Sequence, residues 1–329
     1  MKFRVGTFNL FQFVEPPYAW YTKKEKFTPR QWAEKTKWIK QQIIKMDCDI
    51  IGFQEVFSRD ALESLVKELG FAYFATVDRA KLSTNNPQKY VTTTVAIASR
   101  FPITQLEDVP IDHPSLIRHR CDEAFAFSRI PIKATVILPD KQELWVYVCH
   151  LKSNRLNAFE HTFFARHTLE EKKAIITQVI EGKGSQALKQ RLGEASSLFF
   201  DSQHSSPQKP ILLLCDLNDK EFSITIDALC NPKYHDATSP YDPILYDAYY
   251  HHTEPIKNPH PEQREPSRKA TSYFQGRGSV LDYVFISREF TVTNYTVLDA
   301  HLQTNPDGSL IQSDHAQVVC ELRLDGTNR

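Results

Sequence analysis

The sequence has no excess of charge of either sign and no long apolar run. Its 329 residues include 40 Lys and Arg against 40 Asp and Glu, so the formal net charge is +0. This balance excludes a strongly basic chain that would bind nucleic acid over its whole surface, although a local basic groove remains compatible with it. No apolar run approaches the ~18 residues of a transmembrane helix. We therefore expect no stable membrane insertion.

The six cysteines lack the paired spacing of zinc or redox motifs, because no two of them form a CxxC pair. Three lie in apolar runs, which predicts buried free thiols rather than a disulfide framework. The N-terminal stretch carries Lys2 and Arg4, its apolar part is short and broken by Asn9, and no small-residue cleavage site follows. These features predict a cytoplasmic protein; secretion by another route stays open.

What the chain does contain is enough apolar and aromatic material for a large core, with 41% hydrophobic and 12% aromatic residues. Apolar runs of strand length recur at 3–9, 49–56, 91–99, 143–150, 210–217, 279–287 and 315–322. Helical patterns lie between them, at 29–46, 58–70 and, as two helices, within 158–200. Alternating strands and helices without a long linker predict a single α/β domain over residues 1–329.

The helix predicted at 29–46 has a proline and a capping residue at its start, Pro29 and Thr28. Its expected buried face is formed by residues at near-helical spacing, namely Trp32, Ala33, the stem of Lys37, Ile39, Ile43 and Ile44.

Two further segments stand out. A helical insertion is expected at about 155–205, where Arg191 and Glu194 are interpreted as a structural pair on a helix. A loop at about 253–272 contains four prolines, and long irregular loops of this kind are often functional. We expect it to form part of the rim of a site. No protein partner can be inferred from these patterns.

Polar residues recur at the ends of the predicted strands. They are Asn9, Gln54, Glu55, His150, Asp216, Asn218, Asp282, Asp314 and His315. Each one alone is more simply explained as a turn residue, a helix cap or a satisfied histidine. Together they indicate a catalytic site, because loops at the ends of strands on a rigid sheet are where catalytic groups are placed.

The residue types at these positions point to phosphate chemistry. Carboxylates and amides without a Cys/His cluster suit Mg²⁺, or Mn²⁺ as the alternative, rather than zinc. Two histidines, His150 and His315, could then donate hydrogen bonds or protons to phosphate oxygens. The set fits hydrolysis of a phosphoester by water, with the metal stabilising charge on the oxygens bound to phosphorus.

Six motifs in order resemble the endonuclease/exonuclease/phosphatase superfamily, which has the DNase I-like fold. They are TFNL, GFQEV, HLKS, CDLND, LDYVFIS and SDHAQVV, and they cover residues 5 to 319. The resemblance implies a four-layer α/β sandwich, in which two packed mixed or antiparallel β-sheets are flanked by helices.

The resemblance also implies roles for individual residues. Glu55 resembles the principal Mg²⁺ ligand, assisted by Asn9, and Asp314 resembles a ligand that acts directly or through water. The implied catalytic set is His150 on the scissile phosphate, Asp216 and Asn218 on the water and phosphate, and Asp282 orienting His315. Two cations, Arg129 and Lys152, resemble substrate-binding residues, although a solvated surface arginine explains Arg129 nearly as well.

The sequence departs from the family pattern at three places. Phe11 stands where some repair endonucleases have an aspartate, and Cys215 stands where a glycine is usual. The region 90–103 contains no acid that could pair with His150, as a glutamate does in DNase I.

Three functions follow from these patterns. The leading hypothesis is a metal-dependent phosphodiesterase that acts on nucleic acid, that is, a nuclease. The alternative within the enzyme class is a phosphatase or phospholipase-type enzyme acting on inositol phosphates, sphingomyelin or another small phosphoester. A catalytically silent binding module is the third, and the intact set of acids and histidines argues against it.

Overall fold

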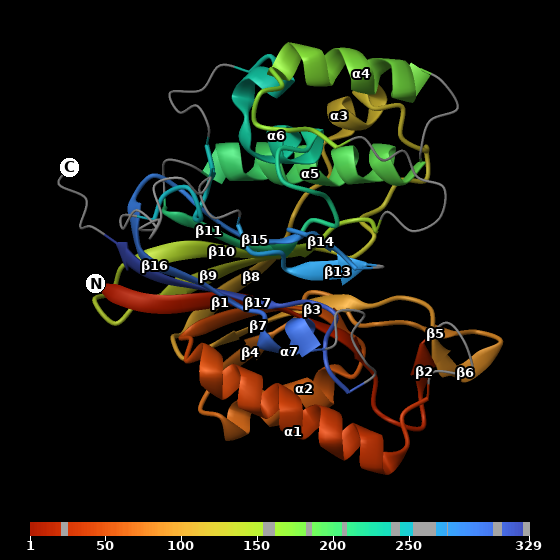
Figure 1. Cartoon of the computed structure of the whole chain (residues 1–329), viewed down its shortest axis with the longest axis vertical. Coiled ribbons are helices and arrows are strands. Elements are labelled where there is room, and N and C mark those ends of the chain that lie inside the picture. The colour runs from red at the N-terminus through yellow and green to blue at the C-terminus, as the bar shows by residue number, and fades with distance from the viewer. Residues whose placement is uncertain are drawn as a thin grey trace.

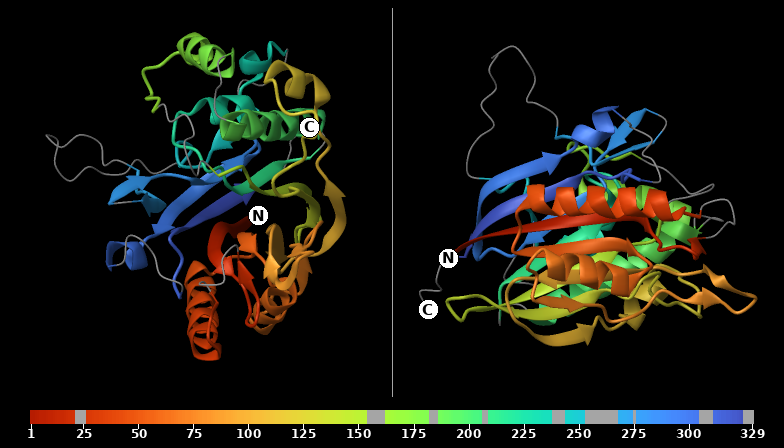
Figure 2. Two further views of the ribbon diagram at one scale, coloured as in Figure 1. Left: turned by 90° about the vertical axis from the view of Figure 1, so that its right-hand side faces the viewer. Right: turned by 90° about the horizontal axis from the view of Figure 1, so that it is seen from below.

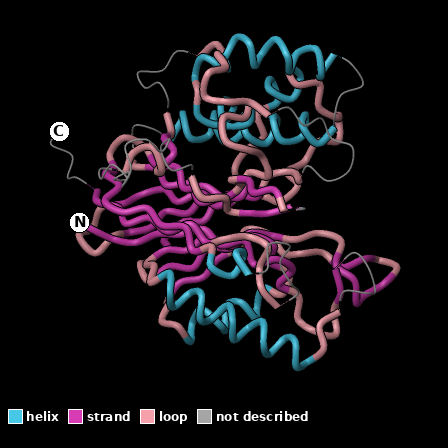
Figure 3. Tube along the Cα trace, in the orientation of Figure 1, coloured by secondary structure: helices cyan, strands magenta, loops and turns pink. Residues whose placement is uncertain are grey.

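The computed structural model describes residues 1–20, 26–153, 162–181, 186–205, 209–237, 244–252, 268–274, 276–304 and 311–324. In this part of the chain, two packed β-sheets form the centre of the molecule and helices lie outside them (Figures 1 and 3). The predicted proline-rich loop lies outside the described residues up to position 267, as do residues 154–161 of the predicted insertion.

The first sheet combines the beginning and the end of the chain. Its order is β16 (Phe290–Leu298), β17 (Gln317–Leu324), β1 (Lys2–Phe13), β3 (Ile50–Val56), β7 (Thr94–Ser99) and β4 (Tyr73–Ala75). Strands β1 and β3 are parallel, whereas β17 runs antiparallel to β1. The last strand of the chain therefore lies beside the first.

The second sheet is built from the middle of the chain. Its order is β12 (Tyr246–Asp247), β15 (Asp282–Ile286), β11 (Ile211–Asp216), β10 (Glu143–His150), β9 (Ile132–Ile137) and β8 (Ile103–Asp108). Its central strands β10 and β11 are parallel, and β15 is antiparallel to β11. Two smaller sheets join β13 (Ser272–Phe274) with β14 (Arg277–Ser279), and β2 (Ala19–Trp20) with β6 (Asn86–Tyr90) and β5 (Leu82–Ser83).

Helices cover the outer face of each sheet, as the views in Figure 2 show. The first sheet packs on α1 (Pro29–Met46) and α2 (Arg59–Glu68), through residues such as Phe8, Ile39 and Val66. The second packs on the helical layer, which consists of α3 (His113–Arg118), α4 (Leu169–Glu181), α5 (Gln186–Ser205), α6 (Ile224–Cys230) and the 3₁₀ helix η1 (Pro232–His235). A short helix, α7 (Ala300–Thr304), lies between β16 and β17 in sequence.

The two sheets bury their inner faces against each other through branched residues such as Val5, Val148 and Leu214. The sheets approach so closely at Gly52 that a glycine is needed there, because a Cβ on this residue would lie 2.8 Å from the Cβ of Leu214. The order helix, sheet, sheet, helix confirms the predicted four-layer α/β sandwich.

Helix α1 begins as predicted and buries the predicted Ile39 and Ile43, but Ala33 and Lys37 are exposed and the rest of its buried face differs. Thr28 forms a capping box with Gln31, and Pro29 occupies the first turn. The buried face consists of Lys35, Trp38, Ile39, Gln42, Ile43 and Met46. The prediction for Ile44 was wrong: it is 63% exposed, because each residue advances about 100° around a helix and Ile44 lies beyond the buried stripe.

All six cysteines are free thiols, and five of them are buried, as the sequence predicts. In the described segments, no helix combines the length and the apolar character that crossing a bilayer requires.

Candidate active site

Strand direction explains why polar residues far apart in sequence meet at one end of the sandwich. In the second sheet, parallel strands β10 and β11 end side by side, which pairs His150 with Asp216. The antiparallel strand β15 begins where β11 ends, so Asp282 lies opposite Asp216. In the first sheet, Asn9 pairs with Gln54 near the ends of parallel strands β1 and β3.

His315 reaches the same end from the other direction. It precedes β17, which runs antiparallel to β1, so the start of β17 lies beside the later part of β1. Ser313 fixes this approach: its Oγ donates to the backbone oxygen of Asn9 at 2.7 Å and accepts the amide of His315 at 3.0 Å. The chain end that carries His315 is thus tied to the strand that carries Asn9.

A hydrogen bond joins the two sheets at the site. Asn9 Nδ2 donates to Asp216 Oδ2 at 2.9 Å, and both side chains are buried. The other end of the Asn9 amide, Oδ1, accepts the backbone N–H of Phe11 at 3.0 Å. The predicted ligand Asn9 therefore also orients Asp216, across the interface between the sheets.

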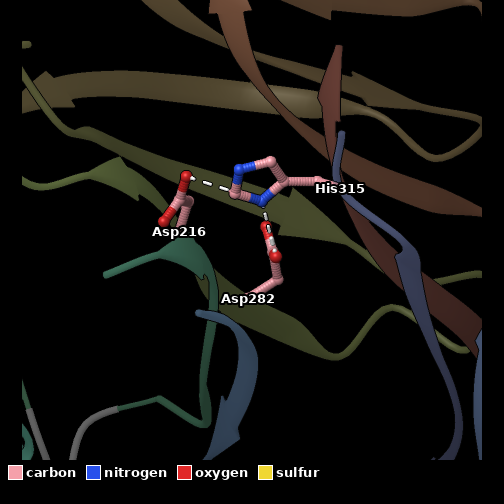
Figure 4. Close-up of side chains that lie close together, drawn as sticks. All are labelled: Asp216, Asp282 and His315. Atoms are coloured by element: carbon pink, nitrogen blue, oxygen red, sulfur yellow. Dashed lines mark hydrogen bonds and ion pairs between the residues drawn. The ribbon is translucent and has the colours of Figure 1, made fainter. Parts of the chain in front are cut away.

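His315 and Asp282 form a buried pair, drawn in Figure 4. The imidazole Nδ1 lies 2.8 Å from Asp282 Oδ2. Because an ionised carboxylate only accepts hydrogen bonds, Nδ1 carries the proton in this pair. Burial opposes a charge on His315, but the carboxylates of Asp282 and Asp216 raise its pKa well above the usual range. The structure thus contains the His315–Asp282 contact on which the predicted role of His315 depends.

Asp216 lies at the centre of the cluster. Its Oδ2 is 3.4 Å from His150 Nε2 and 3.9 Å from His315 Nδ1, while its Oδ1 accepts the backbone N–H of Asn218 at 2.8 Å. Burial raises the pKa of Asp216 above its usual range, and the neighbouring His315 partly opposes that shift. A carboxylate whose pKa is raised in this way is a better proton acceptor.

The predicted metal ligands Glu55 and Asp314 both affect the pKa of one buried side chain, that of Lys35. Lys35, on α1, is fully buried. Burial lowers the pKa of Lys35 to about 7, while Glu55 and Asp314 raise it. Both carboxylates therefore lie near enough to influence this amine, and Glu55 Oε2 also accepts the backbone N–H of Gln12 at 2.9 Å.

Oxygen donors of this kind fit a hard divalent cation. A second possible group is formed by Asp216, Asp282 and His315, whose ligand atoms lie within 4.8 Å of one another. Its closest contact is the His315–Asp282 hydrogen bond, however, and a charged imidazole would repel a metal ion. The pair formed by Glu55 and Asp314 contains no imidazole, and the lowered pKa of Lys35 reduces the positive charge beside it, so these carboxylates fit a hard cation better.

Unusual backbone conformations gather where the strands end. Phe11, Gln12, Glu55 and Asn218 all have positive φ, between 49° and 57°. Asparagine adopts this conformation readily, but for Phe11, Gln12 and Glu55 it costs roughly 1–2 kcal/mol each, and strain of this kind clusters at functional sites. In this conformation, the backbone N–H of Gln12 donates to Glu55 Oε2.

The predicted substrate-binding cations are placed differently. Arg129 is half-buried, and its Nη1 donates to the backbone oxygen of Leu151 at 3.0 Å. Asn218 Nδ2 donates to the same oxygen, also at 3.0 Å. Both side chains thus meet beside His150. The side chain of Lys152 is exposed.

One residue that the sequence did not single out connects the two halves of the His315–Asp282 pair. Thr271 is fully buried. Its Oγ1 accepts the backbone N–H groups of Leu281 at 2.9 Å and Asp282 at 3.1 Å, and its carbonyl accepts that of Ala316 at 2.6 Å. A threonine at the end of a proline-rich loop gives no sequence signal for this role.

Comparison with known proteins places the chain in a family. The sequence profile of the Endonuclease/Exonuclease/phosphatase family matches residues 6–315. No curated protein gives a significant sequence match. The solved structures that share the fold at low sequence identity include the following three.

The first is an endonuclease/exonuclease/phosphatase family protein from Bacteroides thetaiotaomicron, with 16% identity and a TM-score of 0.59, covering 99% of each chain. The second is the human nocturnin catalytic domain with a bound sulfate anion, with 16% identity and a TM-score of 0.58, covering 98% of this chain and 94% of that one.

The third is a mannosyl-6-phosphatase from Bacteroides thetaiotaomicron, with 17% identity and a TM-score of 0.58, covering 98% of this chain and 99% of that one. Such identities show the fold alone, whereas the profile match spans nearly the whole sequence. The chain therefore belongs to the endonuclease/exonuclease/phosphatase family of phosphoester hydrolases.

Proposed function

We propose that the protein is a Mg²⁺-dependent phosphodiesterase that cleaves nucleic acid with an activated water molecule. The observation that carries the proposal is the buried His315–Asp282 pair with Asp216 beside it. This cluster places a charged hydrogen-bond donor, His315, next to a proton acceptor, Asp216. The adjacent carboxylates of Glu55 and Asp314 supply the acidic surroundings that such a hydrolase needs for a metal.

Glu55 and Asp314 would hold the ion, with Asn9 as the third predicted ligand and Mn²⁺ as the alternative metal. When bound, the ion would stabilise negative charge on the oxygens of the phosphate. Asn9 also keeps Asp216 in place through its Nδ2 group.

In the proposed reaction, Asp216 orients the attacking water and accepts its proton, for which its raised pKa suits it. His315 keeps Nδ1 on Asp282, which leaves Nε2 to donate to the phosphate. His150 and Asn218 contact the phosphate from the second sheet. Arg129 adds positive charge beside the phosphate. One of the five N–H donors of its guanidinium binds the backbone oxygen of Leu151, which leaves further donors for the phosphate.

A small phosphoester is the second candidate substrate. The equal numbers of acidic and basic residues favour a small substrate over a long polyanion such as nucleic acid. One structure that shares the fold is named a mannosyl-6-phosphatase. Inositol phosphates and sphingomyelin belong to the same candidate class. The free thiols fit the reducing cytoplasm, where we propose that the enzyme acts.

The test is a substrate screen of the purified protein. Plasmid DNA, single-stranded DNA, RNA, a sugar phosphate, an inositol phosphate and sphingomyelin are each incubated with Mg²⁺, Mn²⁺ or EDTA. We expect cleavage of nucleic acid with Mg²⁺ and a loss of at least ~10²-fold in EDTA, because charge stabilisation by the metal is removed.

Three results would contradict parts of the proposal. Cleavage that persists in EDTA would exclude the metal mechanism. Hydrolysis confined to the small phosphoesters would replace the nuclease by the second candidate. A His315→Ala protein as active as the parent would attribute the activity to a contaminant and restore the catalytically silent binding module.

A further inference from the structure

Helix α5 lies against the second sheet (Figure 1), and two of its charged side chains are buried behind the loop that follows His150. Glu194 is 1% exposed and Arg191 is 2% exposed. Buried charges at this depth are costly unless hydrogen bonds satisfy them. Their partners therefore indicate what these two side chains hold.

Glu194 binds two loops at once. Its Oε2 accepts the backbone N–H of Lys152 at 2.8 Å, and its Oε1 accepts that of Ser128 at 2.7 Å. The first loop follows the strand that ends in His150, and the second leads to Arg129. One carboxylate thus joins the two segments that carry His150 and Arg129.

Arg191 binds the other backbone group of Lys152, its carbonyl oxygen. Its Nη1 donates to the backbone oxygen of Lys152 at 3.2 Å, and its Nε lies 3.4 Å from Asp219 Oδ2. Asp219 directly follows Asn218, and its Oδ2 also accepts Thr225 Oγ1 at 2.6 Å. The N–H and the C=O of Lys152 are therefore both bound by α5, and the loop of Asn218 is attached to the same arginine.

The preceding carbonyl, of Leu151, accepts Arg129 and Asn218. Two successive carbonyl groups and one amide after His150 are consequently fixed by four side chains. Ordinary packing of a helix on a sheet does not need such a set. Rigid support of this kind is what keeps a catalytic group within a fraction of an ångström of its working position.

We propose that Arg191 and Glu194 of α5 are positioning residues for catalysis, which fix the backbone at Leu151 and Lys152 and thereby place His150 against the scissile phosphate. This inference rests on the proposed function, because the phosphate is the group that His150 would meet.

A glutamine at position 194 separates this role from packing. Glutamine has nearly the same shape as glutamate, but one of its two polar ends donates hydrogen bonds. It can accept only one of the two backbone N–H groups and places a donor against the other. If Glu194 served packing alone, Glu194→Gln would change little.

The experiment compares Glu194→Gln, Arg191→Met and Arg191→Lys with the parent, and with Glu170→Gln as a control. Glu170 is an exposed acid on the neighbouring helix α4, so this control removes the same charge without touching the loop. Thermal unfolding checks the fold, NMR hydrogen exchange follows the Lys152 amide, and kcat and KM are measured on the substrate found in the screen.

In Glu194→Gln and Arg191→Met we expect kcat to fall ~10-fold or more with a smaller change in KM, because misplacement of a catalytic group acts on the transition state. The Lys152 amide should exchange at least ~10-fold faster in Glu194→Gln, whereas amides within β10 keep their rates. Arg191→Lys should recover part of kcat by keeping the charge near Asp219.

Faster exchange with unchanged kcat would overturn the catalytic role while leaving phosphoester hydrolysis intact. Unchanged exchange and unchanged kcat in Glu194→Gln would overturn the inference altogether. A parent protein that hydrolyses no phosphoester would overturn the proposed function itself, a result that the substrate screen gives before any variant is made.

Discussion

Buried histidines in two regions of the molecule have opposite electrostatics. In the helical layer, burial lowers the pKa of His119 to about 3 and that of His235 to about 4. At the active-site end, the pKa of the equally buried His315 is raised well above the usual value. All three side chains are buried, so burial alone does not account for the difference.

The neighbours of each ring account for it. His119 Nε2 lies 3.0 Å from Ser196 Oγ, His235 Nε2 lies 2.7 Å from a backbone oxygen, and the cation of Arg118 lies close to His235. His315 instead has the carboxylates of Asp282 and Asp216. A buried imidazole is therefore favoured as neutral in the first setting and as charged in the second, where the proposed reaction uses that charge.

The largest expected effect comes from removing the carboxylate that holds His315. Asp282→Asn keeps the shape of the side chain but loses the charge that stabilises the imidazolium, so we expect kcat to fall at least ~10²-fold. Asp236→Asn, which changes an exposed acid of the helical layer, is the matched control. A kcat for Asp282→Asn equal to that of the control would show that the charge on His315 has no part in the reaction.

The neutral histidines predict acid sensitivity of the helical layer. The unfolded chain binds a proton on each histidine near its ordinary pKa of 6.5, whereas folded His235 does so only near 4. Stability from these groups is therefore complete above pH 6.5 and is lost as the pH falls toward 4. At pH 5 each histidine should cost about 2 kcal/mol, at 1.36 kcal/mol per pH unit.

Denaturant unfolding at pH 7 and at pH 5 measures this loss. In His235→Asn the fall in unfolding free energy between the two pH values should be about 2 kcal/mol smaller than in the parent, because the proton binding of His235 no longer contributes. An equal fall in both proteins would mean that His235 is already protonated in the folded state.

A smaller effect is expected at Thr271, which binds the backbone N–H groups of Asp282 and of Ala316, the residue after His315. Thr271→Val keeps the shape but leaves two buried N–H groups without an acceptor, so we expect a loss of roughly 1–2 kcal/mol of stability and a several-fold fall in kcat. Thr271→Ser keeps the hydroxyl and should stay close to the parent. Equal losses in the two variants would assign the effect to the missing methyl group rather than to the hydroxyl.

The sequence predicted most of the fold because its strands are bounded by clear polar residues. The run at 210–217 became β11 (Ile211–Asp216), and the two helices of the insertion are α4 and α5. Among the elements that it did not predict are β8, β9, β16 and α3. Most residues of β8 are exposed, so the strand lacks an apolar stripe, and α3 has only six residues.

Within the site, the sequence identified residues but not their contacts. Asn9 and Asp216 stand 207 positions apart, and their hydrogen bond depends on how the two sheets dock. Lys35 was the missed residue with a readable signal: it lies in line with Ile39 on the buried face of α1, where a lysine needs an explanation. Left-handed backbone at Phe11 and Glu55 has no counterpart in residue preference, since neither type favours it.

The Asn9–Asp216 bond has a consequence for how the protein acquires its activity. Neither sheet holds a complete site, because Asn9 and Glu55 come from the first and His150, Asp216 and Asp282 from the second. Within the first sheet, moreover, strand β1 gains its antiparallel neighbour only when β17 has paired with it. A fragment that ends before β17 therefore has no assembled site, and the rate at which activity returns during refolding reports the docking of the two sheets.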